Sequence, residues 1–381
     1  MSRLEELIAD LCPDGVEYKA LGEIAEVGTG SSNGNEAIDD GMYPFFIRSQ
    51  TVKYKNEFEY DDEAIIIPGE GGIGEIFHYI NGKYALHQRV YRIHFILQTI
   101  NTRFAYYYMQ AYFKPFIMKK AVSATVTSIR KPMIENFSIP VPPLPVQSEI
   151  VKILDNFTEL TAELTAELTA RRKQYEYYRD KLLSFEEANG VVWRTLGDIG
   201  KVSMCKRIMK AETSSSGDVP FFKIGTFGKE ADAYITQEKF EEYRSTYPFP
   251  KKGDILISAA GTIGRTVIYD GKPAYYQDSN IVWLDNDERI VLNKYLYYYY
   301  QLQPWAVSTG GTIARLYNDN INKAQICVPS LEEQAHIVAI LDRFDALCND
   351  LTSGLPAEIA ARQRQYEYYR DKLLTFRELT T

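Results

Sequence analysis

Apolar residues recur at three- and four-residue steps over a long stretch in the middle of the chain. The stripe runs from Ile150 through Leu154, Leu160 and Leu168 to Leu182, which is the spacing of one face of an α-helix. Forty residues of helix reach about 60 Å, at about 1.5 Å per residue. A helix of this length cannot bury its stripe against one small domain, so the pattern predicts a second long helix as its partner.

The partner is predicted near the end of the chain, where the same stripe runs from Ile337 to Leu374. Ser330, with a glutamate three residues later, is typical of a helix start. The stripe is interrupted at 353–356, where the sequence reads Ser-Gly-Leu-Pro. We therefore expect two long antiparallel helices that form a coiled coil, the second with a break.

The two stripes lead into nearly identical sequences. QYEYYRDKLLSF at 174–185 returns as QYEYYRDKLLTF at 365–376, and VPPLPVQSEIVKILDNF at 141–157 returns as VPSLEEQAHIVAILDRF at 328–344. Repeats of this kind indicate a duplicated architecture. The first helix also contains the smaller repeat TAELTAEL at 161–168, which can gain or lose a copy without breaking the helix.

The segments that precede the helices alternate apolar and polar residues, as strands do. In the first half, Asn81-Gly82 predicts the turn of a hairpin, and residues 100–120 predict an aromatic-rich helix. The second half repeats this plan, with strands over 220–285 and a tyrosine-rich helix from 291. Each half is long enough for a core of its own.

The predicted fold class is therefore α+β with a pseudo-twofold internal repeat. It consists of two tandem mixed α/β domains separated by two long antiparallel helices that form a coiled coil. The predicted boundaries are 1–145 for the first domain, 146–188 for the central helix, 189–330 for the second domain and 331–381 for the C-terminal helix.

Composition narrows the functional classes. Hydrophobic residues make up 45% of the chain, yet no apolar run approaches eighteen residues, so no membrane span is expected. The four cysteines lie far apart without C-x-x-C pairing, which favours a reducing cytoplasm. A net charge of −8 argues mildly against nucleic-acid binding. Local basic stretches free of acids, around Lys119 and around Lys206, leave that class open.

Motifs for catalysis are weak or missing. Gly69, Gly71 and Gly74 match a dinucleotide fingerprint formally, but the residues that follow predict strands instead of the required helix. The sequence contains no phosphate-binding G-x-x-x-x-G-K-[ST] loop and no Asn/Asp-Pro-Pro-aromatic motif of adenine methyltransferases, and its four histidines lack metal-ligand spacing. We therefore predict no catalytic residue, metal site or cofactor site in this chain.

The duplicated layout, the VPxLxxQ-to-ILD helix start and the QYEYYRDKLL helix end resemble the specificity subunit of type I restriction-modification systems, over essentially the whole chain. The resemblance implies two target-recognition domains, each reading one half of a split double-stranded DNA site, with the helices setting their spacing. It also implies two adenine-methyltransferase (modification) subunits and the restriction/translocase subunits as partners. Adenosylmethionine and ATP would then act in those partners, in the cytoplasm.

DNA contacts are expected from polar and basic loops at matching positions of the two halves. The candidates in the first half are Arg48, Ser49, Gln50, Lys53, Lys55, Gln88, Arg89, Ser123, Thr125, Thr127, Ser128, Arg130 and Lys131. Those in the second half are Lys206, Arg207, Lys210, Lys223, Gln277, Asp278, Asn280, Thr309, Thr312 and Arg315. Tyr175, Tyr178, Tyr366 and Tyr369 on the repeated helix ends are predicted partner contacts, because tyrosine suits half-buried interfaces.

Two alternatives remain at this point. A purely structural adaptor that binds proteins through its repeated helices would show no sequence-selective DNA affinity. An enzyme with a nucleotide at the glycine turn would bind a dinucleotide or adenosylmethionine as an isolated chain.

Overall fold

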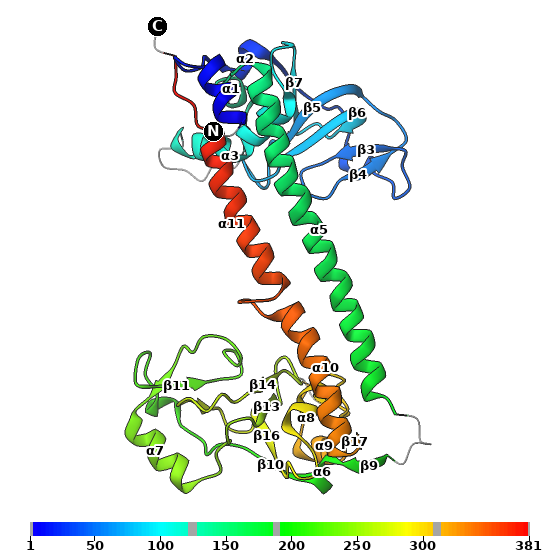
Figure 1. Ribbon diagram of the computed structural model, residues 1–381, viewed down its shortest axis with the longest axis vertical. Helices are drawn as coiled ribbons and strands as arrows, with labels where there is room; N and C mark the ends of the chain where they lie inside the picture. The colour runs from blue at the N-terminus through cyan, green and yellow to red at the C-terminus, as the bar shows by residue number, and fades with distance from the viewer. Residues whose placement is uncertain (1–2, 121–127, 186–190, 308–313, 380–381) are drawn as a thin grey trace. The chain divides into compact units, whose positions relative to one another are not determined.

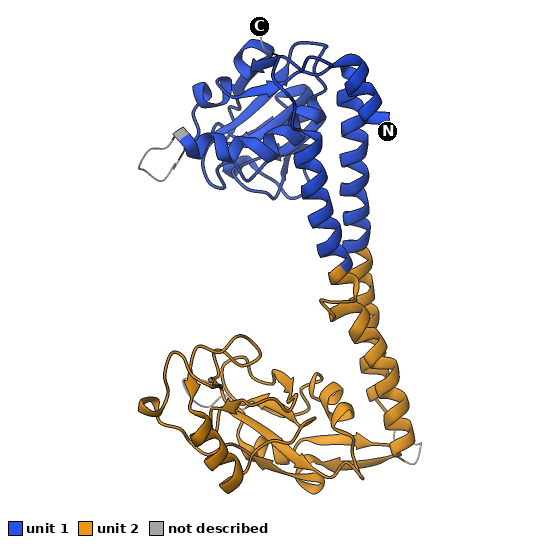
Figure 2. Ribbon diagram, turned by 60° about the vertical axis from the view of Figure 1, so that its left-hand side comes forward, with its two compact units in different colours: residues 1–165, 358–381 blue, residues 166–357 orange. Residues whose placement is uncertain are grey.

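A computed structural model describes residues 3–120, 128–185, 191–307 and 314–379. The chain divides into two compact units (Figure 2): unit 1 comprises residues 1–165 and 358–381, and unit 2 comprises residues 166–357. Each unit contains sheet, short helices and a pair of long helices, so the predicted fold class is confirmed. Within the described ranges, no helix is long and apolar enough to cross a membrane.

Unit 1 is built on one six-stranded sheet (Figure 1). Its elements are α1 (Arg3–Leu11), β1 (Tyr18–Ala20), α2 (Leu21–Ile24), β2 (Ala25–Thr29), η1 (Gly34–Glu36), β3 (Tyr43–Phe46), β4 (Lys53–Lys55), β5 (Tyr60–Pro68), β6 (His78–Leu86), β7 (Val90–Phe95), α3 (Thr102–Lys120), α4 (Lys131–Glu135), β8 (Ser138–Pro140) and the start of α5 (Leu144–Leu183). The sheet order is β2-β7-β5-β6-β3-β4, and β1 pairs with β8 in a separate ribbon. Only β3 and β6 pair in parallel among these strands.

The central strand β5 is buried on both faces. Ile65 and Ile67 pack into the core beneath α3, whereas Ala64 and Ile66 pack into a second core with β3 and β6 residues on the opposite face. Successive side chains of a strand point to opposite faces, so a continuous apolar run fits a strand covered on both sides. The short AIIIP run of the sequence has this origin.

Unit 2 repeats the plan with separate sheets. Its elements are β9 (Val192–Thr195), α6 (Leu196–Ile199), β10 (Gly200–Ser203), η2 (Lys210–Glu212), β11 (Val219–Phe222), β12 (Tyr234–Ile235), α7 (Gln237–Thr246), β13 (Ile255–Ser258), β14 (Thr266–Ile268), β15 (Tyr275–Tyr276), β16 (Ile281–Asn286), α8 (Asn293–Tyr300), α9 (Asn318–Asn322), β17 (Gln325–Val328) and α10 (Leu331–Asn349). The order β10-β16-β13-β14 matches β2-β7-β5-β6 of unit 1, and β11 pairs with β15 in parallel as β3 does with β6. The ribbon β17-β9 corresponds to β1-β8.

The hairpin predicted at Asn81-Gly82 is wrong. Both residues lie inside β6, where Asn81 pairs with Glu63 and Gly82 with Asp62 of β5. Gly82 has a φ of 121°, which glycine tolerates inside a strand and other residues rarely adopt. The Asn-Gly signal therefore marks a local distortion of a long strand, and the chain reverses instead at the glycine turn between β5 and β6.

A buried glutamine explains why the VPxLxxQ sequence is repeated. In unit 1, the Gln147 amide accepts a hydrogen bond from the Asn101 N–H at 2.8 Å and donates to the carbonyls of Thr99 (2.8 Å) and Pro142 (2.6 Å). The chain turns here from the domain into α5. The Gln147 amide therefore connects the loop before α3 to the start of the long helix.

Gln334 makes the same three bonds in unit 2. It accepts from the Leu292 N–H at 2.9 Å and donates to the carbonyls of Ile290 (3.0 Å) and Pro329 (2.9 Å). Both glutamine side chains are fully buried. The repeated motif is thus a structural joint between each domain and its long helix.

The aspartate of each ILD sequence forms a second joint. Asp155 accepts from Tyr107 of α3 at 2.5 Å and from Arg103 at 2.7 Å. Asp342 in turn accepts from Tyr298 and Lys294 of α8. Tyrosine hydroxyls that are buried need such partners, so these tyrosines belong to the domain interior.

The predicted helix pairing is confirmed within each unit, and both pairs are antiparallel. In unit 1, α11 (Leu355–Leu373) runs beside the first part of α5. Leu374 shares a core cluster with Val146. Tyr369 stacks on Phe157, with the ring centroids 5.6 Å apart. In unit 2, the last part of α5 runs beside α10. Tyr178 stacks on Phe344, with the ring centroids 5.8 Å apart.

The break between α10 and α11 lies at residues 350–354. The Asp350 carboxylate accepts from the Thr352 N–H at 2.7 Å and from the Ser353 hydroxyl at 2.5 Å. These bonds hold the pKa of Asp350 down to about 2. A Cβ on Gly354 would lie 2.4 Å from the Ala346 carbonyl oxygen, so only glycine fits this reversal.

Each repeated helix end packs in the unit that does not contain its preceding domain. The 174–183 part of α5 lies in unit 2, and 365–373 of α11 lies in unit 1. The chain after α11 also joins unit 1, where the Val16 N–H donates to the Arg377 carbonyl and the Leu379 N–H to the Val16 carbonyl, both at 2.9 Å. Unit 1 is thus assembled from the two ends of the described chain.

Candidate nucleic-acid interface

Several loops of unit 1 meet at one edge of its sheet. The Gly69 N–H, just after β5, donates to the Arg89 carbonyl in the β6–β7 turn at 2.8 Å. The Ile129 N–H, ahead of α4, donates to the Gly69 carbonyl at 2.8 Å, and the His87 N–H donates to the Phe46 carbonyl at 3.0 Å. We call this cluster of loops site 1; it comprises residues 47–52, 69–77, 87–89 and 128–130.

The same hydrogen bonds define an equivalent cluster in unit 2. The Ala259 N–H donates to the Asn280 carbonyl at 2.8 Å, the Leu316 N–H to the Ala259 carbonyl at 2.9 Å, and the Gln277 N–H to the Phe222 carbonyl at 2.9 Å. Site 2 therefore comprises residues 223–230, 259–264, 277–280 and 314–316. The two sites share a backbone frame but carry different side chains.

Site 1 contains two arginines held by one carboxylate. Glu70 contacts the Arg89 guanidinium at 2.5 Å and that of Arg48 at 3.1 Å. The hydrogen bond from Arg89 is the largest cause of a lowered pKa at Glu70. The side chains of Arg48 and Arg89 are 49% and 56% exposed, so both guanidiniums remain accessible to an anionic or acceptor-rich ligand.

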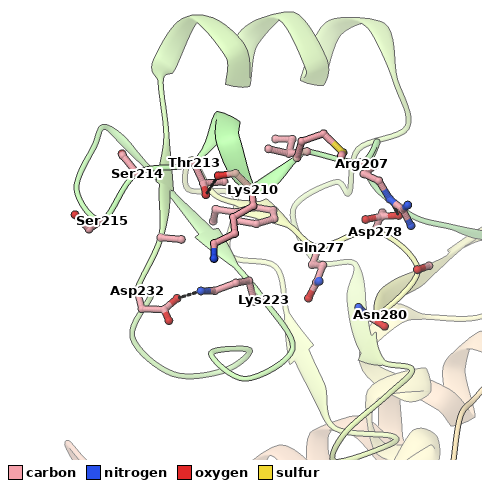
Figure 3. A pocket seen from close by; sticks show the side chains of 15 residues that line it. Arg207, Lys210, Thr213, Ser214, Ser215, Lys223, Asp232, Gln277, Asp278 and Asn280 are labelled. Carbon is pink, nitrogen blue, oxygen red and sulfur yellow. Dashed lines mark hydrogen bonds and ion pairs between the residues drawn. The ribbon is translucent and has the colours of Figure 1, made fainter. Parts of the chain in front are cut away.

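An open cavity of about 570 Å³ borders site 2 (Figure 3). Its lining includes six of the predicted residues, namely Arg207, Lys210, Lys223, Gln277, Asp278 and Asn280. Arg207 pairs with Asp278 at 2.9 Å, and Lys223 pairs with Asp232 at 2.8 Å. Arg315, also predicted, donates to the Ser279 carbonyl at 2.8 Å. Residues from distant parts of the sequence thus converge on one cavity, whose lining includes three basic and two acidic side chains.

The remaining predicted contacts lie in several environments. Gln88 donates to the Asn33 side chain at 3.1 Å, Ser49 donates to the Thr51 carbonyl at 2.9 Å, and Lys206 lies over the Tyr247 ring. Gln50 in site 1 and Lys53 just after it are exposed. Ser128 and Arg130 precede α4, and Lys131 is its first residue. The predicted contacts outside the described residues are Ser123, Thr125, Thr127, Thr309 and Thr312.

Lys55 was predicted as a DNA contact, and its position in the structure corrects that prediction. Its residue is 8% exposed, and its ammonium donates to the Ser32 hydroxyl and the Glu36 carboxylate, each at 2.9 Å. It faces inward because β4 packs against the loop that carries both partners. Alternation on a short strand did not reveal which lysine points outward, and the structure assigns Lys55 to the interior.

The glycine turn is not followed by a helix. Gly71, Gly72 and Gly74 all have positive φ, between 54° and 71°, and β6 begins at His78. A dinucleotide fold requires a helix N-terminus at this point to bind the pyrophosphate, so the geometry does not fit that ligand. Within the described ranges, no group of three or more His, Cys, Asp or Glu residues is placed to hold a metal ion.

Glu70 and Ser279 were missed by the sequence analysis. Aligning the two glycine turns would have shown that Glu70 has no acidic counterpart, because Ala260 takes its place. Ser279 has a φ of 53°, a left-handed conformation that costs a non-glycine residue of order 1 kcal/mol. No sequence pattern signals such strain at a serine.

The tyrosines of the repeated helix ends separate into buried and exposed members. Tyr175 is 6% exposed and donates to Gln301 at 2.8 Å, so its predicted partner contact is corrected to an internal one. Tyr366 is half-buried in unit 1, whereas Tyr178 and Tyr369 are 37% and 36% exposed. The most exposed tyrosines of the two helix ends are Tyr177 (61%) and Tyr368 (64%).

Comparison with known proteins places these features in a family. Residues 13–171 and 189–361 each match the family described as the type I restriction modification DNA specificity domain. Among curated proteins, a Haemophilus influenzae protein named as a type I restriction enzyme specificity subunit is 47% identical over 378 residues, covering 95% of this chain and 96% of the relative. The Escherichia coli EcoR124I/EcoR124II specificity subunit is 38% identical over 271 residues, 65% of this chain and 66% of that protein.

Solved structures show the same fold at low sequence identity. The S subunit of a type I system from M. genitalium has a TM-score of 0.61 at 15% identity, covering 94% of this chain and 96% of that one. A chain from a study of type I R-M complex assembly and conformational transition has a TM-score of 0.63, also at 15% identity, covering 95% and 98%. With two matched domains and a close full-length relative, this chain belongs to the type I restriction-modification DNA specificity family.

Proposed function

We propose that this chain is the DNA-reading subunit of a type I restriction-modification complex, in which site 1 and site 2 each read one half of a split double-stranded site. The observation that carries the proposal is the shared backbone frame of the two sites, combined with their different side chains. Gly69 and Ala259 make the same contact, whereas Arg89 and Asn280 stand at matching positions. Such a pair fits two half-sites of different sequence.

The electrostatics of the sites support DNA as the ligand. Arg48, Arg89, Arg207 and Lys223 are each paired with a carboxylate and exposed by 42–66%. Exposed pairs of this kind contribute little stability, so a phosphate or a base edge can replace the carboxylate at small cost. The chain can therefore carry a net charge of −8 and still present basic loops to DNA.

We further propose that methylation and cleavage are performed by partner chains, two modification subunits and the restriction/translocase subunits, which bind adenosylmethionine and ATP. This subunit itself would then be non-catalytic and need no cofactor. All four cysteines are free and buried, which suits a reducing cytoplasm.

The test is genome-wide mapping of methylated adenine in cells that produce this chain with its cognate modification subunit. Cells with the modification subunit alone are the control. A new split motif, two short blocks around a fixed gap, is the expected result. A complex that forms without any new motif would contradict DNA reading and favour a structural adaptor.

We propose that the exposed tyrosines of the two helix ends are contacts for the modification subunits. Tyr177 and Tyr368 occupy the same place in the repeated sequence, and each packs edge-on against its neighbour, Tyr178 or Tyr369, with ring centroids 5.3 Å apart. Tyrosine is enriched at the energetic centres of protein interfaces. Two equivalent aromatic patches, one on each long helix, match two copies of one partner.

Replacing Tyr177 or Tyr368 by alanine should weaken one of the two modification-subunit sites by about tenfold, as loss of an interface anchor does. Titration calorimetry with the modification subunit would show two equal sites for the unaltered chain and one strong site for each variant. Tyr54→Ala, at a tyrosine 43% exposed on β4, is the matched control. Unchanged stoichiometry and affinity in both variants would place the contact elsewhere.

A further inference from the structure

Arg89 and Asn280 occupy equivalent positions at the ends of equivalent turns. The carbonyl of each accepts a 2.8 Å hydrogen bond, from the Gly69 and Ala259 N–H groups respectively. The next residue in each case is the fully buried first residue of a central strand, Val90 of β7 or Ile281 of β16. The backbone is thus fixed on both sides of the side chain, as a base-reading residue requires.

In site 2, every other residue of the turn is occupied. The Gln277 amide oxygen accepts from the Ile224 N–H at 3.1 Å, the Asp278 carboxylate holds Arg207, and the Ser279 carbonyl holds Arg315. The Asn280 side chain, in contrast, makes no hydrogen bond within the described residues and lies at the cavity (Figure 3). It is the amide of this turn whose donor and acceptor are both available.

The free donor and acceptor of the Asn280 amide determine which base this side chain can recognise. Adenine presents an N7 acceptor beside an N6 donor in the major groove, and an asparagine or glutamine amide matches both at once. Gln277 already accepts the Ile224 N–H with its amide oxygen, so that oxygen is shared with the backbone. Asn280 retains the complete pattern.

Site 1 presents a different pattern at the same position. Arg89 uses one guanidinium nitrogen for Glu70, and its other N–H groups make no hydrogen bond within the described residues. Guanine presents two acceptors, O6 and N7, which a guanidinium matches. The Glu70 carboxylate occurs where the reading residue is a cation, and Ala260 occurs where that residue is neutral, which indicates that Glu70 positions Arg89.

We propose that Arg89 and Asn280 are the matched specificity-determining residues of the two units, Arg89 selecting a G·C pair in one half-site and Asn280 an A·T pair in the other. This rests on the DNA-reading function proposed above. It adds which residues discriminate, which base each prefers, and a positioning role for Glu70.

The test exchanges the two residues in the full complex with the modification subunit. For Arg89→Asn, Asn280→Arg and the unaltered chain, methylation is measured on DNA libraries in which each base pair of the split motif is varied in turn. Arg89→Asn should convert one position of one half-site from G to A, by about tenfold to a hundredfold. Asn280→Arg should convert one position of the other half-site from A to G, and each variant leaves the second half-site unchanged.

Truncation and control variants complete the design. Arg89→Ala and Asn280→Ala should flatten the preference at the same two positions, and Glu70→Ala should reduce the preference for G at the Arg89 position several-fold. Lys272→Ala, whose side chain is 84% exposed in the turn between β14 and β15, should leave the motif unchanged. Thermal unfolding of each variant shows whether it is folded before its motif is interpreted.

The outcomes distinguish failure of the proposed function from failure of this inference. If the unaltered complex produces no split motif, the proposed function fails. If it produces one and the exchanges weaken methylation uniformly at every base, Arg89 and Asn280 contact phosphates and this inference is overturned. Conversion of positions in the same half-site by both exchanges would overturn it equally.

Discussion

Replacing Gln334 by alanine should lower the free energy of unfolding of unit 2 by about 3–5 kcal/mol, and Gln147→Ala should do the same to unit 1. Each amide satisfies one backbone N–H and two carbonyls at the joint between domain and long helix. Each buried group left unpaired costs about 1–3 kcal/mol. Partial access of water to the vacated space keeps the total below the full sum.

The tryptophans allow the two units to be measured separately. All three, Trp193, Trp283 and Trp305, lie in unit 2, so tryptophan fluorescence in a urea titration follows that unit, while far-ultraviolet circular dichroism follows both. Gln334→Ala should shift the fluorescence transition to lower urea. Gln147→Ala should shift the dichroism signal and leave the fluorescence transition close to its original midpoint.

Two controls separate hydrogen bonding from other effects. Gln334→Met keeps most of the side-chain volume, so a similar loss of stability would assign the effect to the three hydrogen bonds rather than to a cavity. Gln363→Ala, at an exposed position of α11, should change stability by less than about 0.5 kcal/mol. Gln334→Ala unfolding at the original urea concentration would show that the joint does not stabilise the unit.

Inserting one further TAEL after Leu168 should abolish methylation at the original split motif and create a new one, with the same half-sites and a gap longer by one or two base pairs. Four residues add about 6 Å to a helix and slightly more than one turn, so the apolar stripe returns nearly to the same face. Base pairs are spaced by about 3.4 Å along DNA. A change of this kind alters the position of the half-sites and none of the residues that read them.

Methylation mapping is again the measurement, and the sequence of the insert is its control. An insertion of two alanines would turn the helix by about 200°, place the stripe on the opposite face and should abolish methylation altogether. Altered half-sites, or an unaltered gap after the TAEL insertion, would contradict the role of the helix as a spacer.

The sequence was sufficient to predict the long helices from apolar periodicity, their break from Ser-Gly-Leu-Pro, and the duplication from the repeated stretches. It was also sufficient to predict that Arg207, Gln277 and Arg315 belong to one functional region, although they lie far apart in the chain. The reason is that each followed or preceded a predicted strand at a position matched in the other half. In the structure, Arg207 and Gln277 line the cavity beside site 2, and Arg315 donates to the neighbouring Ser279 carbonyl.

The direction of individual side chains could not be predicted from sequence patterns. Lys55 reads as an ordinary strand lysine until the loop that carries Ser32 and Glu36 is folded against it. Tyr175 and Tyr177 lie two positions apart on one helix, and only packing in unit 2 distinguishes the buried ring from the exposed one. Likewise, no pattern in the glycine turn indicates a role for Glu70, because its partners Arg48 and Arg89 come from two other loops.

The exchange of helix ends has a consequence for synthesis of the chain. Domains fold in general as they leave the ribosome, N-terminal first, yet unit 1 requires α11 and residues up to Leu379, which emerge after all of unit 2. Until then, Val16 lacks its hydrogen-bond partners Arg377 and Leu379, and the cluster around Phe104 and Ile150 lacks Leu374. The unit that is synthesised first is therefore completed last. A chain stopped after residue 357 would contain all of unit 2 beside an incomplete, aggregation-prone unit 1.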